Sequence, residues 1–376
     1  MAGTAWISVP SFIDNYPWKK FQTRILKYLS YFIGLVIIFA ASYLEISTLT
    51  VDKPKSFFIL ITLAILIIAV IYICFAHFIS LKRVSIRLLW IHQAQFAGIY
   101  SAKYAGIFER AGLRVKITEP AINSHPVNDF DASEDDFAIV AGIDVIRMWV
   151  NHNQRIRSVL PIVRTNPFVI YAKREAGINE IKDLVGRKIG IQKDYETEIY
   201  FKAFVKKHNL DPSDFEYVSC NFDVDDFINS ENVAQIGYVG CEPVLLKQRK
   251  IPITQFNLSE EDLSGYADTI VVQESMLQAE KPVVRAFVDA VIKGWKFTAK
   301  NKEIALVFIM HLSTTGNKNF ERNFLNQILE IINGSNGRLG DEQSVDEWQG
   351  MIDFLVELGV IKPDHKINVS KIIYDI

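Results

Sequence analysis

Two long apolar runs close to the N-terminus constrain the fold of this chain more than any other feature. The first covers residues 25–45, and the second, residues 56–79, contains no Asp, Glu, Lys or Arg. About 20 apolar residues in a helix cross the ~30 Å hydrocarbon core of a bilayer. A buried core helix is the alternative, but a run of this length without a polar face does not match one. The pattern predicts a transmembrane hairpin over residues 25–82, behind a polar and aromatic tail over residues 1–24.

The charges around the hairpin predict its orientation. Basic residues flank both outer ends of the two runs, whereas the short loop between the runs holds Lys53 and Lys55. The positive-inside rule places basic flanks on the cytoplasmic side of a membrane. We therefore expect an integral membrane protein of a bacterial or mitochondrial inner membrane, with the tail and the large C-terminal domain in the cytoplasm or matrix. Membrane lipid and other integral membrane proteins are the partners expected along residues 25–79. The basic flanks are Lys19, Lys20 and Arg24 before the first run, Lys27 at its start, and Lys82, Arg83 and Arg87 after the second.

From residue 84 the pattern changes to alternating strands and helices, and residues 88–117 open this part of the chain. A strand that ends at Trp90 is followed by a polar turn with Gln93 and Gln95, a helix with small residues on one face, a stop at Gly112 and a second strand. That order is a β-α-β unit. Ligands in open α/β sheets bind where the carboxyl end of a strand meets the next helix, so the turn between Trp90 and Gln95 is the first candidate site.

The same stretch resembles the opening of a family of solute-binding proteins, which includes thiamine-pyrimidine synthases and the binding proteins of ABC importers for pyrimidine precursors. Further matches follow in order at residues 183–190, 237–243 and 282–305, so the resemblance covers roughly residues 86–360. It implies an α/β fold, the bilobed type II periplasmic-binding-protein fold, over residues 84–376. Lobe 1 is expected at about 84–170 and 265–376, and lobe 2 at about 171–264. Importer-binding proteins work outside the membrane, so the periplasmic side is the alternative location. The matching residues of the opening are Trp90, Gln93, Ala94, Gln95, Phe96, Ala97, Gly98, Tyr100, Ala102, Gly106, Gly112, Leu113 and Val115.

Four residues are predicted to bind a ligand because of their chemistry and their place at a turn. Trp90 can stack on a flat heterocycle, while the amides of Gln93 and Gln95 can orient it. Glu242 lies before a proline in a glycine-rich turn, where its carboxylate can accept hydrogen bonds from a ring amine or an amino group. The alternatives are that Trp90 plugs the strand end as part of the core and that Glu242 forms a salt bridge between the lobes.

Further ligand contacts are expected at the crossing between the lobes and at the start of a helix in lobe 2. Asn166 precedes a proline, so its backbone is extended and its side chain can project into the cleft; an Asx-type turn is the alternative. The helix begins at Tyr195, Glu196 and Thr197, with Asp194 as the predicted N-cap. Free amides at this start favour an anionic or carbonyl group, and an ordinary capped helix is the alternative.

No catalytic constellation emerges from the sequence. The histidines are scattered, and no GxSxG, HExxH or P-loop motif accompanies them. The synthases of the family that this chain resembles carry a cysteine-rich run and a lysine that holds pyridoxal phosphate, and neither is found here. The acidic run at residues 131–136 is predicted to be a solvated turn, because no glycine-punctuated calcium loop is present. We therefore expect no catalytic residues, no metal and no cofactor, and a net charge of −2 argues against a nucleic-acid partner.

Two hypotheses of different classes follow. The first is a membrane-anchored solute-binding module that closes on a small polar or heteroaromatic ligand, such as a pyrimidine precursor of thiamine. The alternative is an accessory or structural subunit of a larger membrane complex, which keeps the binding-protein fold without transport or catalytic activity. A cleft filled by the protein's own side chains would favour the accessory subunit.

Overall fold

The computed structural model describes residues 62–64, 66–68, 70–71, 81–120, 130, 135–151, 156–261, 263, 265–334, 339–363 and 367–375. The chain divides into two compact units, Met1–Lys82 and Arg83–Ile376. Apart from residues 62–64, 66–68 and 70–71, which are helical, the two predicted membrane spans lie outside the described residues. Among the helices that can be described, none has both the length and the apolar character needed to cross a membrane.

The second unit contains two five-stranded sheets in its described part, one for each lobe. The first sheet has the order β2-β1-β3-β10-β4. Strands β1 and β3 run parallel, with Ile86 opposite Phe137, whereas β10 runs antiparallel to both β3 and β4. The strands of this sheet are β1 (Lys82–Arg87), β2 (Leu113–Thr118), β3 (Phe137–Ala141), β4 (Ile156–Pro161) and β10 (Asp268–Gln273).

The second sheet has the order β7-β6-β8-β5-β9. Strand β5 pairs antiparallel with both β8 and β9, while β6 runs parallel to β7 and β8. The chain therefore crosses from the first sheet to the second between β4 and β5 and returns before β10. The predicted lobe boundary near residue 171 falls inside β5. The strands are β5 (Phe168–Lys173), β6 (Lys188–Ile191), β7 (Glu216–Ser219), β8 (Ala234–Tyr238) and β9 (Ile253–Asn257).

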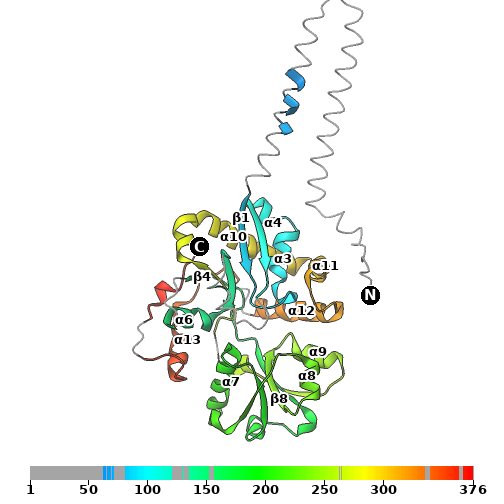
Figure 1. Ribbon diagram of the computed structural model, residues 1–376, viewed down its shortest axis with the longest axis vertical. Helices are drawn as coiled ribbons and strands as arrows, with labels where there is room; N and C mark the ends of the chain where they lie inside the picture. Colours follow the sequence, from blue (N-terminus) through cyan, green and yellow to red (C-terminus); the bar gives the residue numbers. More distant parts are fainter. Residues whose placement is uncertain are drawn as a thin grey trace, which may run out of the picture. The chain divides into compact units, whose positions relative to one another are not determined.

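Helices cover both sheets, as Figure 1 shows for this unit. The helices of lobe 1 are α3 (Ala97–Tyr104), α4 (Ile107–Arg110), α6 (Gly142–Asn151), α10 (Glu274–Lys300), α11 (Lys302–Leu312), α12 (Lys318–Gly334) and α13 (Val345–Glu357). Those of lobe 2 are α7 (Glu196–Lys207), α8 (Val224–Asn229) and α9 (Glu242–Gln248). The predicted bilobed α/β architecture is confirmed.

The small residues predicted on one face of the first helix allow α3 and α10 to pack closely. A Cβ atom added at Gly98 would lie 2.3 Å from Cγ of Trp295, and one added at Gly294 would lie 2.2 Å from the carbonyl oxygen of Gly98. Thr298 adds a hydrogen bond to Ser101 Oγ at 2.7 Å. This contact holds α3 against the long helix α10 and so fixes the loop that precedes α3.

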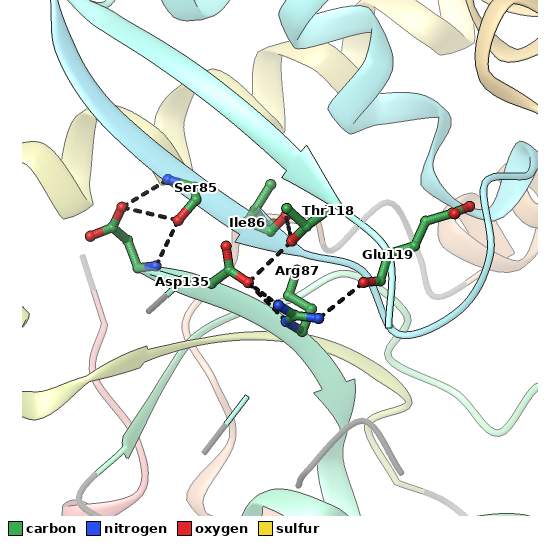
Figure 2. Close-up of polar contacts among 7 residues, drawn as sticks. Ser85, Ile86, Arg87, Thr118, Glu119 and Asp135 are labelled. Atoms are coloured by element: carbon green, nitrogen blue, oxygen red, sulfur yellow. Dashed lines mark hydrogen bonds and ion pairs between the residues drawn. The ribbon is translucent and has the colours of Figure 1, made fainter. Parts of the chain in front are cut away.

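Strand β1 ends at Arg87, three residues before the predicted end at Trp90. Polar contacts to β2 and to the start of β3 hold this end, as Figure 2 shows. Arg87 pairs with Asp135 at 2.7 Å and donates to the carbonyl oxygen of Glu119 at 3.0 Å. Asp136 accepts a hydrogen bond from the backbone N–H of Ser85 at 2.8 Å. Residues 131–134 of the acidic run lie outside the described residues, whereas Asp135 and Asp136 are half-buried and bonded to β1, so the predicted solvated turn does not hold for these two.

Candidate ligand-binding site

A cavity lies between the two lobes, where strands end and helices begin. About 680 Å³ of its space holds no atom, a figure that includes open solvent, and about 80 Å³ of it admits the centre of a water-sized molecule. Seven of the eight predicted binding residues line it. They are Trp90, Gln93, Gln95, Tyr195, Glu196, Thr197 and Glu242, together with Leu89, Ala141, Phe168, Phe222, Gly237, Tyr238, Cys241, Ala267 and Asp268, which the sequence reasoning did not select.

The loop after β1 brings Trp90 to the cavity because its backbone is held on two sides. The N–H of His92 donates to Glu119 Oε1 at 2.5 Å, and the N–H of Ala94 donates to Glu321 Oε2 of α12 at 2.8 Å. Trp90 itself is half-buried and meets the ring of Phe222 edge to face, with ring centroids 5.9 Å apart. Since Phe222 belongs to lobe 2, the two lobes each supply an aromatic ring. The alternative of a buried Trp90 plug is wrong.

The two predicted glutamines form a hydrogen-bonded chain that ends on a carboxyl group. Gln93 Nε2 donates to Gln95 Oε1 at 2.8 Å, and Gln95 Nε2 donates to both oxygens of Asp268, at 3.0 and 2.8 Å. Gln95 therefore positions Asp268, which begins β10 opposite Ala141. The sequence signal that could have identified Asp268 is its position as a lone aspartate at the start of an otherwise apolar strand.

Three acidic side chains line the cavity and are almost fully buried. Asp268, Glu242 and Glu196 are 1%, 6% and 8% exposed. Burial raises the pKa of Asp268 and of Glu242 to about 7 each. Burial, and then the nearby Asp144, raises the pKa of Glu196 to about 8. At neutral pH these carboxyl groups hold protons in part, and each gains from a donor or a positive charge inside the cavity.

Glu242 is fixed by its own turn and not by the other lobe. Its Oε2 accepts from the N–H of Tyr238 at 2.9 Å, and a Cβ at Gly237 would lie 2.4 Å from this oxygen, so the turn requires glycine there. The described residues contain no salt bridge from Glu242 to lobe 1, so that alternative is wrong.

Cys241 is a small packing residue, and burial raises the pKa of its thiol well above the ordinary value.

The cavity also contains polar atoms that have no partner in the protein. The hydroxyl groups of Thr197 and Tyr238 are buried without a hydrogen bond. No lysine, arginine or histidine is among the lining residues. The site can therefore hold a small molecule that offers N–H donors or a positive charge, and no cationic side chain lines it to favour the anion that was predicted at the start of α7.

Two predicted features are placed differently. Asn166 is not among the lining residues: its Nδ2 donates to the carbonyl oxygen of Leu263 and its Oδ1 accepts from the N–H of Phe168, each at 2.9 Å. The bond from Phe168 is the Asx-type turn given as the alternative, and the bond to Leu263 ties the two crossings between the lobes. Asp194 is not the N-cap of α7, because it has a left-handed φ of 68° and Tyr195 takes that position.

This arrangement, two α/β lobes with a cavity at the strand ends between them, is that of the type II periplasmic-binding-protein fold. The periplasmic aliphatic sulphonate-binding protein SsuA of Escherichia coli shares the fold, with a TM-score of 0.61 and 13% identity, covering 78% of this chain and 97% of SsuA. The chain belongs to the NMT1/THI5-like family, whose model matches residues 93–305. The family resemblance predicted from the sequence is confirmed.

Two relatives carry names that describe what they bind. The chain is 25% identical over 283 residues to a formylaminopyrimidine-binding protein of Halalkalibacterium halodurans, which covers 73% of this chain and 85% of that protein. It is 23% identical over 230 residues to the riboflavin-binding protein RibY of Chloroflexus aurantiacus, which covers 60% of this chain and 65% of RibY.

Proposed function

We propose that this solute-binding protein is a membrane-anchored module that closes on a small nitrogen heterocycle, an amino-substituted pyrimidine of the kind used to build thiamine. The observation that carries the proposal is the composition of the cavity. Trp90 and Phe222 offer aromatic edges from opposite lobes, and three buried carboxyl groups offer acceptors for ring and amino N–H groups. The pyrimidine named for one relative is a donor-bearing ring of this class.

The cavity also distinguishes between the ligands of similar proteins. A sulfonate carries a fixed negative charge, and no lysine, arginine or histidine lines the cavity to pair with it. A flavin offers fewer ring donors than an aminopyrimidine and is much larger. We therefore expect affinity in the order aminopyrimidine, riboflavin, sulfonate.

Isothermal titration calorimetry tests the proposal. The full chain, kept in detergent, is titrated with 4-amino-2-methylpyrimidine, riboflavin and ethanesulfonate. Saturable binding of the aminopyrimidine with one site per chain is the expected result. Absence of binding by all three compounds would overturn the proposal, and co-purification of the chain with a fixed membrane partner would then favour the accessory subunit.

The membrane anchor rests on the sequence pattern of residues 25–45 and 56–79 and on the basic residues that flank them. It is tested by extraction of native membranes at alkaline pH, in which an integral protein stays with the lipid pellet. Protease protection in sealed vesicles then reports the side: the charge pattern predicts that residues 84–376 are on the cytoplasmic or matrix side, and the periplasmic side is the alternative.

A further inference from the structure

We infer that Glu196 shares a proton with a basic ring nitrogen of the ligand, so that the occupied cavity contains an ion pair between this carboxylate and a protonated heterocycle. The inference rests on the proposed function and deepens it, because it names the charge of the bound ligand and the residue that recognises it. It also predicts that the same ring without a basic nitrogen is a poor ligand.

Glu196 is the acidic side chain of the cavity that accepts no hydrogen bond from another described residue, so it is available to a ligand. Both oxygens of Asp268 accept hydrogen bonds from Gln95, and Glu242 accepts a hydrogen bond from the N–H of Tyr238. In the described part of the chain, only the backbone N–H of Glu196 itself donates to its carboxyl group. Glu196 nevertheless lines the cavity and is 8% exposed. A buried acceptor without a partner from another residue is costly when it is charged, so a ligand donor is the group that it lacks.

The groups around Glu196 make the site more negative. Asp144 and Asp268 both raise its pKa, whereas the guanidinium of Arg147 lowers it more weakly. Arg147 is directed elsewhere, because its Nη1 donates to Asp144 at 2.8 Å and to the carbonyl oxygen of Asp194 at 3.0 Å. The phenol of Tyr200 is a further titratable neighbour, and it stays protonated at neutral pH because burial raises its pKa. A positive charge on the ligand is therefore favoured beside Glu196.

A second polar group, the hydroxyl of Thr197, supports the same kind of ligand. Thr197 follows Glu196 in the first turn of α7 and lines the cavity, and its hydroxyl is buried without a hydrogen bond. A carboxylate and a neighbouring hydroxyl together offer acceptors to the N–H donors of a protonated, amino-substituted ring.

The proton balance depends on pH in a defined way. Near neutral pH the empty Glu196 is largely protonated and a weakly basic ring is largely neutral. The O–H bond of Glu196 then breaks and an N–H bond forms on the ring, without net exchange with solvent. At a pH well above 8 the carboxylate is already ionised, so binding takes up one proton from solvent. At about pH 5 the ring already carries its proton, so binding expels the proton of Glu196.

Calorimetry of the full chain with 4-amino-2-methylpyrimidine measures this exchange when it is repeated in buffers of different ionisation enthalpy. We expect proton release at about pH 5 and proton uptake at about pH 9. Glu196→Gln should remove most of the uptake and weaken binding at least tenfold. Glu198→Gln is the matched control, because Glu198 lies two residues further along α7 and pairs with Lys202 outside the cavity lining, so both properties should be retained.

A second probe separates the inference from the proposed function. 4-Hydroxy-2-methylpyrimidine has nearly the same shape but lacks the basic amino-pyrimidine edge, and we expect at least tenfold weaker binding that Glu196→Gln does not weaken further. Equal affinity for the two rings, or unchanged affinity of the aminopyrimidine for the Glu196→Gln protein, would overturn the inference and leave the proposed function intact. Absence of binding by both rings would overturn the proposed function itself.

Discussion

At the scale of single residues, the cavity is built from side chains whose ordinary states are disfavoured by burial. Three carboxyl groups lie where water cannot solvate them, and each raised pKa follows from that loss of solvation. Aromatic rings from both lobes add apolar surface beside these acids. We therefore expect a flat molecule with N–H donors to be favoured in the cavity, because its donors replace the hydrogen bonds that these acids lose with water.

Replacement of Trp90 by alanine should weaken ligand binding by about 10- to 100-fold, or roughly 1.4–2.8 kcal/mol, because the ligand loses a stacking surface. Trp90 is only half-buried, so the midpoint of urea unfolding should change little. Calorimetry and equilibrium unfolding of Trp90→Ala and Trp90→Phe measure the two effects. Trp90→Phe retains a ring and should recover most of the affinity. Equal affinity of the alanine variant and the unaltered protein would show that the indole does not contact the ligand.

The buried acids also predict how the stability of the empty protein depends on pH. Glu196 titrates near 8 when folded and near 4.5 when unfolded, so between these values the folded state binds more protons. The free energy of unfolding should therefore fall as pH rises from about 5 to about 8, by up to about 1.4 kcal/mol for each pH unit. Asp268 and Glu242 act in the same direction. Urea unfolding at several pH values checks the slope, and Glu196→Gln should reduce it. A slope of opposite sign would contradict the assigned burial of these acids.

At the scale of helices and strands, the position of the cavity depends on close packing far from the ligand. Gly98 and Gly294 let α3 and α10 approach until no side chain fits between them. The loop that carries Trp90, Gln93 and Gln95 leads directly into η2 (Ala94–Phe96) and α3, so this packing sets where the loop lies. On the opposite side, α12 packs against both η2 and α9 and thus contacts both lobes.

Introduction of a larger side chain at Gly98 should disrupt this packing. A valine there would place Cβ against Trp295, and overpacking of this kind costs about 1–3 kcal/mol or more. Gly350 is the control, since it lies within helix α13 and a Cβ there meets nothing within 4 Å. Gly350→Ala should leave stability unchanged or raise it by about 0.5–1 kcal/mol. Thermal unfolding of both variants decides, and equal melting temperatures would refute the close approach of α3 and α10.

At the scale of the whole molecule, the second compact unit contains the entire cavity lining. We therefore expect the proposed ligand recognition to depend on the second unit. Deletion of residues 1–80 should release the protein from the membrane fraction and leave the affinity for the aminopyrimidine within about twofold, because each tenfold change would require ~1.4 kcal/mol of lost contacts. Fractionation and calorimetry of the truncated chain check both results. A truncated chain that folds but has lost affinity would show that the first unit contributes to the site.

Much of this organisation could be predicted from the sequence because it is encoded locally. The polar turn after Trp90, the turn at Glu242 and the start of α7 each follow an apolar strand, and strand ends meet at one edge of a sheet. The pairing of Asp268 with Gln95 could not be predicted, since these residues are 173 positions apart and only the antiparallel return of β10 brings them together. Asn166 was misplaced for a related reason: its amide is taken by Leu263, a residue of the return crossing.

The most direct test of the central claim is an experimental structure of the chain with 4-amino-2-methylpyrimidine. The account predicts density for one ring in the cavity between the lobes, beside Trp90 and Phe222, with a ring nitrogen within hydrogen-bond distance of a Glu196 oxygen. A ring bound elsewhere, or a cavity from which these three side chains are turned away, would contradict it.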